Sequence, residues 1–315
     1  MLARQLDSPC IVITIFVICN PFCQASNGKG NRWKDDWMTN VVIGAASGMG
    51  AATARKIAHR GRLIVADYNL EGAEKIAAEI GGDVRAMACD ISNQAQIDAL
   101  MAEVGDNLEA LIVTAGVSGS QAPGRRILEV NLMGVERVVR AAEAKVRPGT
   151  VAVLVASQSG YMVPNVPELF EVIDNPLAPD FMDRLSQILD VDVPSPCYQL
   201  SKRGVHRMVR RHAKTWGLKG GRILSLSPGI SDTPMGNEEI GNNPIMLKMV
   251  EACPMGRPGT PEDIANVMEF LTSPGAGYMT GSDVLVDGGM SNVLPMNAWE
   301  GKIRLPLKAG LAPRF

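Results

Sequence analysis

The sequence predicts an α/β fold: a doubly wound parallel sheet of about seven strands, in one domain over residues 38–293. Short apolar runs alternate along the chain with amphipathic stretches, which indicates successive strand–helix–strand units. A glycine-rich turn follows the first apolar run, where such folds pass sharply from a strand into a helix. The composition, 46% hydrophobic and 20% charged over 315 residues, is that of a globular chain with a large core.

The apolar runs are rich in Val, Ile and Leu, as strands covered on both faces should be. We predict strands at residues 41–45, 62–66, 84–88, 110–114, 151–156, 222–227 and 284–287. The amphipathic stretches predict helices at residues 50–59, 70–80, 94–104, 128–145, 198–216 and 261–272. Right-handed crossovers through these helices would make the strands parallel.

Two segments interrupt this alternation, and we expect both to form the substrate pocket. Residues 161–196 are an insertion, with six prolines between Pro164 and Pro196. Residues 231–258 form a loop region after the sixth strand and contain four methionines. Segments at this edge of a parallel sheet commonly build a pocket or its lid.

The first 37 residues differ from the rest of the chain. Residues 11–19 are an apolar run that is too short to span a bilayer but has the length of a signal-peptide core. Alternatively, residues 1–37 are an upstream extension or a misassigned start, because Met38 directly precedes the first strand. We favour the second interpretation and therefore expect a cytoplasmic protein, with export as the alternative. Residues 294–315 form a C-terminal tail with no assigned role.

The charge and the cysteines exclude several classes of function. A net charge of −2 and 4% aromatic residues argue against a nucleic-acid partner, and we expect no membrane partner. The six cysteines form no paired CxxC spacing, and the three histidines match no metal motif. We therefore expect neither a structural disulfide framework nor a bound metal.

The glycine-rich turn after the first strand predicts a nucleotide site. It reads Gly44-Ala45-Ala46-Ser47-Gly48-Met49-Gly50, a G-x-x-x-G-x-G variant of the dinucleotide fingerprint, and a helix follows. Glycines allow the tight turn and let the backbone approach a phosphate, whose charge is favourable at a helix N-terminus. The turn predicts a Rossmann-type domain, although a tight strand–helix turn without a ligand remains the alternative.

An acidic residue at the end of the second strand favours NAD over NADP. Asp67 lies 23 positions after Gly44, and no Arg or Lys directly follows it. A carboxylate at about this spacing accepts hydrogen bonds from a ribose 2′-hydroxyl and repels a 2′-phosphate. The alternative is a solvated loop residue.

Two further strand ends fit the same nucleotide crevice. Asp90-Ile91 closes the third strand, and Thr114-Ala115-Gly116 closes the fourth with small residues against which a flat cofactor could lie. Each of these signals is weak by itself.

Tyr198 and Lys202 are candidates for an acid–base pair. They lie four positions apart, so a helix places them on one face. A phenol has a pKa of about 10, and a nearby ammonium stabilises the phenolate and lowers that pKa toward neutrality. Helices also carry this spacing for packing or solvation, so the pair alone decides nothing.

Taken together, these motifs resemble the short-chain dehydrogenase/reductase family over essentially all of residues 41–293. The matching residues are Gly44, Gly48, Gly50, Asp67, Asp90, Ala115-Gly116, Asn131, Ser157, Tyr198, Lys202, Pro228-Gly229 and Thr233. A short interval of 15 positions from Gly116 to Asn131 and a long one of 41 from Ser157 to Tyr198 are similar to the bacterial 3α-hydroxysteroid dehydrogenase/carbonyl reductase branch. The chain departs from the family pattern at Ile43, where Thr is usual, and at Val113-Thr114, where two Asn are usual.

The resemblance implies a role for each of these residues. Tyr198 would be the acid–base group, Lys202 would lower its pKa and hold the nicotinamide ribose, and Ser157 would bind the substrate oxygen. Asn131 would position a water that links Lys202 to solvent. The expected cofactor-binding residues are Gly44, Ser47, Gly48, Met49, Gly50, Asp67, Asp90, Ile91, Thr114, Ala115, Gly116, Tyr198, Lys202, Pro228, Gly229, Ile230 and Thr233.

The resulting expectation is an NAD-dependent alcohol dehydrogenase or carbonyl reductase, with a hydroxysteroid or another hydrophobic carbonyl compound among its candidate substrates. One alternative is a nucleotide-binding regulator of the same fold without turnover. Another is a sugar-nucleotide epimerase or dehydratase, which uses the same Tyr–Lys pair but normally needs a larger C-terminal domain. By analogy with the family we also expect a homodimer or homotetramer.

Overall fold

The computed structural model describes residues 38–242 and 244–293, which form a single α/β domain around one parallel sheet. The strand order is β3-β2-β1-β4-β5-β6-β7. The strands are β1 (Thr39–Ile43), β2 (Arg62–Asp67), β3 (Val84–Ala88), β4 (Leu108–Val113), β5 (Val151–Val155), β6 (Arg222–Pro228) and β7 (Asp283–Val286). All seven predicted strands are confirmed, and every neighbouring pair is parallel. The order reverses direction between β1 and β4, which is where such sheets open a ligand crevice.

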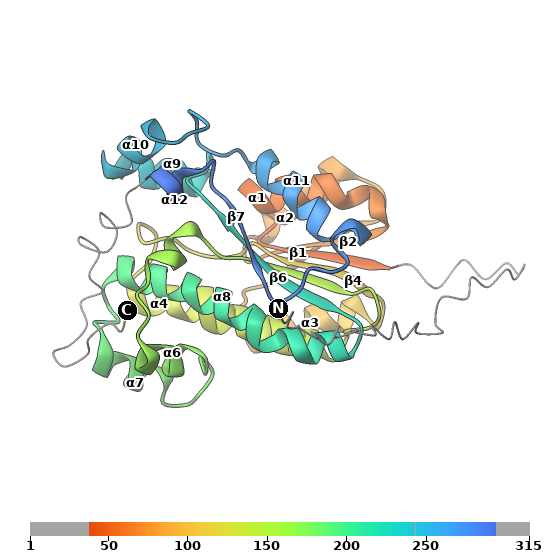
Figure 1. Cartoon of the computed structure of the whole chain (residues 1–315). Coiled ribbons are helices and arrows are strands. Elements are labelled where there is room, and N and C mark those ends of the chain that lie inside the picture. Colours follow the sequence, from red (N-terminus) through yellow and green to blue (C-terminus); the bar gives the residue numbers. More distant parts are fainter. Residues whose placement is uncertain (1–37, 243, 294–315) are drawn as a thin grey trace, which may run out of the picture. The chain divides into compact units, whose positions relative to one another are not determined.

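Helices cover both faces of the sheet (Figure 1). One face carries α1 (Gly48–Ile57), α2 (Leu70–Ile80) and α11 (Pro261–Leu271). The other carries α3 (Gln94–Val104), α5 (Val135–Glu143) and α8 (Pro194–Leu218). Each face buries its own apolar cluster, and central strand residues such as Val42 and Leu111 are fully buried. Burial on both faces explains why the strands read as continuous apolar runs.

The helix predicted at 128–145 is differently built. It starts earlier, with α4 (Gly124–Leu128), and then widens into a π turn, η2 (Glu129–Gly134), before α5 continues it. Gly134 lies directly against Ile91, where a Cβ would come within 2.9 Å of the Ile91 carbonyl oxygen. Such single π turns often lie at functional sites, and this one contains Asn131.

The insertion forms two short helices, α6 (Pro167–Ile173) and α7 (Phe181–Ile188). Their apolar residues, including Leu169, Phe181 and Leu185, are buried in the cluster on the α8 side of the sheet. The insertion is therefore largely a core element. The helix predicted at 198–216 starts earlier than expected: α8 begins at Pro194, and the two prolines in its first turn suit a helix start.

The loop region after β6 contains α9 (Pro234–Asn242) and α10 (Pro244–Glu251), which Figure 1 shows beside α12 (Met290–Val293). The only fully buried apolar residues of this part, among those described, are Ile230, Cys253 and Met290. So small a core is typical of a segment that moves more easily than the sheet.

The predictions for residues 1–37 and 294–315 lie outside the described residues. Within the described part of the chain, no helix combines the length and apolar character that a membrane crossing requires.

Candidate active site

One large cavity, of about 1340 Å³, opens along the carboxyl ends of the strands. It is lined by every predicted cofactor-binding residue and by Ser157. Asn131 is the one predicted site residue that does not line it. The tertiary structure thus brings together side chains that come from six different strand ends.

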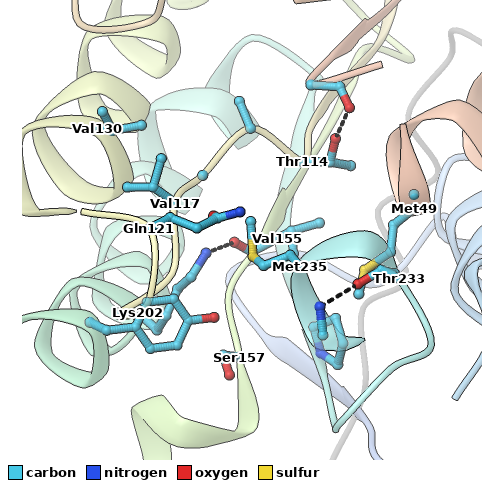
Figure 2. A pocket seen from close by; sticks show the side chains of 18 of the residues that line it. Met49, Thr114, Val117, Gln121, Val130, Val155, Ser157, Lys202, Thr233 and Met235 are labelled. Carbon is cyan, nitrogen blue, oxygen red and sulfur yellow. Dashed lines mark hydrogen bonds between the residues drawn. The ribbon is translucent and has the colours of Figure 1, made fainter. Parts of the chain in front are cut away.

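The two ends of the glycine turn, Gly44 and Gly50, lie so close together that neither position has room for a side chain. A Cβ on Gly50 would lie 1.9 Å from the Gly44 carbonyl oxygen, and Gly44 itself has a φ of +91°. The Thr114 hydroxyl donates to the carbonyls of Ile43 and Gly44, both at 3.0 Å (Figure 2). Thr114, a departure from the family pattern, therefore ties the end of β4 to the turn.

The N-terminus of α1 faces this cavity with free backbone donors. Ser47 is the N-cap residue, but its side chain makes no capping hydrogen bond. The first-turn amides Gly48 and Met49 line the cavity and can accept an anion, which the helix dipole also favours. These features fit a bound dinucleotide. Its pyrophosphate would lie at the glycine turn, against the backbone amides at the N-terminus of α1.

Asp67 lies at the cavity edge with its carboxylate oriented by the backbone. Its Oδ2 accepts from the Ala46 amide and its Oδ1 from the Asn69 amide, both at 2.9 Å. Only 6% of the residue is exposed. The glycine turn and the end of β2 thereby hold the acid in one orientation, and each oxygen keeps a second lone pair for a ligand hydroxyl.

Arg126 is a cavity-lining residue that sequence reasoning missed. It donates to Asp90 Oδ2 at 3.2 Å, to Ser92 Oγ at 2.9 Å and to Glu129 Oε2 at 2.8 Å. Burial would raise the pKa of Asp90, but hydrogen bonds from Ser92 and Arg126 outweigh it and lower that pKa. The contact joins positions 36 apart in sequence, so no local pattern could have indicated it.

Tyr198 and Lys202 lie one turn apart, in the second and third turns of α8, and both line the cavity. The Lys202 ammonium is 5.6 Å from the centroid of the Tyr198 ring. It also donates to the Val155 carbonyl at 3.1 Å, as Figure 2 shows. With 5% of Lys202 exposed, its charge is held in a largely dry environment, where its field on the phenol is stronger than in water.

Asn131 is fully buried behind this pair. Its Oδ1 accepts from the Val117 amide and its Nδ2 donates to the Val117 carbonyl, both at 2.8 Å. A Cβ on Gly116 would lie 3.1 Å from Asn131 Oδ1 and 3.6 Å from Lys202 Nζ. Asn131 thus holds the loop that follows β4 at Val117, and Gly116 lets this loop lie close to the lysine.

Ser157 follows β5 and caps the short 3-10 turn η3 (Gln158–Met162). Its side-chain oxygen accepts from the Ser159 amide at 3.2 Å. Ser157 therefore both caps the turn and lines the cavity.

A polar cluster joins η3 to α8, β6 and β7, with Tyr161 half-exposed and His206 buried. Tyr161 donates to Asp283 Oδ2 at 2.6 Å, and His206 Nε2 lies 2.7 Å from Ser227 Oγ and 3.6 Å from Asp283. Burial is the main cause that lowers the pKa of His206 to about 4, so the ring is neutral at pH 7.

The segment after β6, which contains Gly229 and Thr233, also lines the cavity. Thr233 Oγ1 accepts from the Gly236 amide at 3.0 Å at the start of α9. Gly229 packs on Asp287, where a Cβ would come within 2.7 Å of the Asp287 Cα. This close approach joins β6 to the turn after β7 and fixes the path of the loop that follows.

The pocket walls come from only part of the predicted segments. From the insertion, the residues that reach the cavity are Met162 and Val193-Pro194-Ser195-Pro196, at its two ends. From the loop region, Met235, Met246 and Met249 line it, together with residues next to Gly229. The expected pocket role of the insertion is therefore narrowed to its ends, because its middle is packed into the core.

Comparison with known proteins agrees with this geometry. Residues 39–167 match the family described as "short chain dehydrogenase", and residues 190–291 match the family described as "Enoyl-(Acyl carrier protein) reductase". The chain is 30% identical to cis-4-hydroxycyclohexanecarboxylate dehydrogenase of Sinomonas cyclohexanicum, over 80% of this chain and 96% of that one. It is 29% identical to 3beta-hydroxysteroid dehydrogenase 1 of Eggerthella lenta, over 80% and 93%.

Solved structures give the same result. The 3-ketoacyl-(acyl-carrier-protein) reductase from Brucella melitensis, complexed with NADH, is 26% identical and superposes with a TM-score of 0.61 over 81% of this chain and 98% of that one. The finer resemblance to the 3α-hydroxysteroid dehydrogenase/carbonyl reductase branch stays a prediction. The seven-stranded parallel sheet, the two matched segments and the full-length relatives all lead to one assignment: the chain belongs to the short-chain dehydrogenase/reductase family of oxidoreductases.

Proposed function

We propose that this protein is an NAD-dependent dehydrogenase or carbonyl reductase that interconverts a secondary alcohol and a ketone. The observation that carries the proposal is the convergence of Tyr198, Lys202 and Ser157 on one cavity with the glycine turn. A turnover-free nucleotide-binding regulator would need the turn but would not need this set of groups. An epimerase or dehydratase remains the second alternative by the same Tyr–Lys chemistry.

The roles follow from the chemistry of each side chain. Tyr198 takes the proton of an alcohol hydroxyl, or gives a proton to a carbonyl oxygen, because the Lys202 charge stabilises its phenolate. Ser157 donates a hydrogen bond to the substrate oxygen, where negative charge develops during reduction. The bound nicotinamide supplies or accepts the hydride, and the protein supplies orientation and electrostatics.

Asn131 acts indirectly in this proposal. Its side-chain amide is occupied by Val117, so it supports the wall beside Lys202. The carbonyls of the surrounding π turn are then the groups suited to hold a water that links the lysine to solvent, since a π turn disturbs the regular helical hydrogen bonds.

Asp67 supports NAD as the preferred cofactor. Its fixed carboxylate can accept from a ribose 2′-hydroxyl, and a 2′-phosphate in the same place would meet a negative charge. Tyr68 and Asn69 follow it in the cavity wall, so the neighbouring side chains add no positive charge to offset the repulsion.

The methionines of the cavity wall support one class of substrate. Met162, Met235, Met246 and Met249 give an adaptable apolar surface, which suits a hydrophobic ring alcohol or ketone. Relatives named for a hydroxycyclohexanecarboxylate and for a 3beta-hydroxysteroid support such a ring substrate. A relative named D-threitol dehydrogenase, from Mycolicibacterium smegmatis and 31% identical over 81% of this chain and 93% of that one, makes sugar alcohols the second class to test.

The test is a steady-state screen of cyclic ketones, hydroxysteroids and polyols with NADH or NAD and with their 2′-phosphorylated forms. We expect turnover with NADH and loss of about 100-fold or more in kcat for Tyr198→Phe, while NADH binding by fluorescence titration is retained. Asp67→Ala should lower or reverse the preference for NADH. Near-normal turnover by Tyr198→Phe would refute the acid–base assignment, and tighter binding of NADPH than NADH by the parent would refute the role of Asp67.

A further inference from the structure

The Ser157 hydroxyl accepts two hydrogen bonds from a single neighbour. The Ser159 amide donates to Ser157 Oγ at 3.2 Å, and the Ser159 hydroxyl donates to the same oxygen at 3.0 Å. A hydroxyl has two acceptor lone pairs and one hydrogen. With both lone pairs used, Ser157 has only its hydrogen left to offer to the cavity.

Among the described residues, the Ser157 hydroxyl makes only these two hydrogen bonds and accepts both of them. Its own hydrogen has no acceptor in this part of the chain. Without the Ser159 hydroxyl, Ser157 could rotate and accept a hydrogen bond from an alcohol instead of donating one. The Ser159 contact removes this choice. It therefore selects the orientation in which Ser157 can stabilise negative charge on a substrate oxygen.

The turn that holds both serines is fixed against the helix of Tyr198. Gly160 packs directly on α8, since a Cβ there would lie 2.7 Å from His206 Cε1 and 3.0 Å from the Lys202 carbonyl carbon. On its other side the turn is tied to β7 through Tyr161 and Asp283. The Ser159–Ser157 pair thus keeps a constant position relative to the acid–base residues.

We propose that Ser159 is a positioning residue that makes Ser157 an obligate hydrogen-bond donor to the substrate oxygen. The proposal rests on the proposed alcohol–ketone chemistry. A hydrogen bond received by a hydroxyl polarises the bond that it donates, so Ser159 also strengthens the Ser157 donor. Charge develops on the substrate oxygen during the reaction, so loss of Ser159 should lower kcat. It should not change the affinity for the cofactor.

The decisive comparison uses Ser159→Ala and Ser159→Thr with the best ketone substrate from the screen. Removal of the donor should lower kcat about tenfold, as expected for one net hydrogen bond expressed in the transition state. KM and the Kd for NADH should stay within about twofold, and the melting temperature should be nearly unchanged. Ser159→Thr restores a hydroxyl and should recover most of kcat. Ser273→Ala is a control for the loss of a serine hydroxyl at a 3-10 turn, because Ser273 caps η4 (Pro274–Ala276) and is not part of the cavity wall.

Four outcomes overturn the proposal. An unchanged kcat in Ser159→Ala, or a threonine variant as slow as the alanine variant, shows that the donated hydrogen bond does not matter. A raised KM with normal kcat shows that Ser159 contacts the substrate itself. Equal losses in melting temperature, NADH binding and kcat show a purely structural role.

A second measurement separates this proposal from the proposed function. A crystal structure of the parent at better than about 1.2 Å can show the hydroxyl hydrogens. Ser159 Oγ donating to Ser157 Oγ supports the positioning role whatever the substrate is, and a Ser159 hydroxyl rotated away from Ser157 overturns it. Failure of the screen with every alcohol and ketone would instead overturn the proposed function.

Discussion

Replacing Gly160 with alanine tests how closely η3, the turn that holds Ser157 and Ser159, must pack against α8. The added Cβ would lie 2.7 Å from His206 Cε1, 2.9 Å from the Arg203 amide nitrogen and 3.0 Å from the Lys202 carbonyl carbon. Carbon atoms in contact normally lie about 3.5–4.0 Å apart. Two of the three neighbours are backbone atoms of a long helix, so the turn must retreat by at least about half an ångström.

That displacement should separate Ser157 from Tyr198. Misplacing a catalytic group by about 1 Å can cost about 100-fold in rate, so we expect Gly160→Ala to lower kcat roughly 10- to 100-fold. Overpacking should also cost about 1–3 kcal/mol of stability. The Kd for NADH should change little, because the glycine turn lies at another strand end. Stopped-flow and steady-state kinetics measure the rate, and thermal unfolding measures the stability.

Gly217→Ala is the matched control for this experiment. Gly217 lies in the same helix, α8, and no atom comes within 4 Å of a Cβ built there. Alanine is favoured over glycine inside a helix by about 0.8–1.0 kcal/mol, so this variant should be slightly more stable and equally active. If Gly160→Ala keeps normal kcat and melting temperature, η3 can shift without consequence. The argument that Ser157 and Ser159 need a fixed position relative to α8 is then wrong.

Three further predictions concern the turn and the buried charges. Gly50→Ala should abolish dinucleotide binding in calorimetric titration, because its Cβ would lie 1.9 Å from the Gly44 carbonyl oxygen; measurable binding would contradict this. Burial lowers the pKa of His206 to about 4 in the folded state, below its value of about 6.5 when unfolded. The corresponding stability, about 3 kcal/mol, is fully present above pH 6.5 and is lost as the pH falls toward 4; urea unfolding at several pH values should show this slope, and His206→Gln should lose it. Burial raises the pKa of Glu136, but the hydrogen bond from His212 and the neighbouring arginines outweigh it and lower the pKa to about 2. The contribution of Glu136 to the free energy of unfolding should therefore vanish as the pH falls from about 4.5 to 2. Glu136→Gln should weaken the pH dependence of that free energy over this range in the same urea experiment.

The strands and the cofactor turn could be predicted because their signals are local. A strand covered on both faces must be apolar throughout, so Val41, Ile64 and Leu111 mark their elements without knowledge of their neighbours. The glycine turn is equally local, since Gly44 and Gly50 meet within seven residues. Asp67 ends the second strand, and parallel strands have their carboxyl ends at the same edge of the sheet. Its position therefore placed it at the same edge as the glycine turn.

For the candidate site, the sequence predicted residues that line one cavity, but it did not predict the contacts that these residues make. Ser157, Tyr198 and Lys202 were recognised from their motifs, and their strand-end and helix positions implied a shared edge. The bond of Arg126 to Asp90 and the clamp of Asn131 on Val117 were not foreseen, because side-chain partners depend on how helices settle on the sheet.

By itself, the sequence determined the α/β alternation and the glycine turn after the first strand, and it predicted the acid–base pair, because periodicity and turn chemistry act over a few neighbouring residues. Only the tertiary structure decided that the insertion packs into the core, with Phe181 and Leu185 buried, so that mainly its two ends reach the cavity. It also decided that Tyr161 is tied to Asp283, 122 positions away. The physical reason is that burial and hydrogen-bond partners are set by contacts between distant segments, which local patterns do not encode.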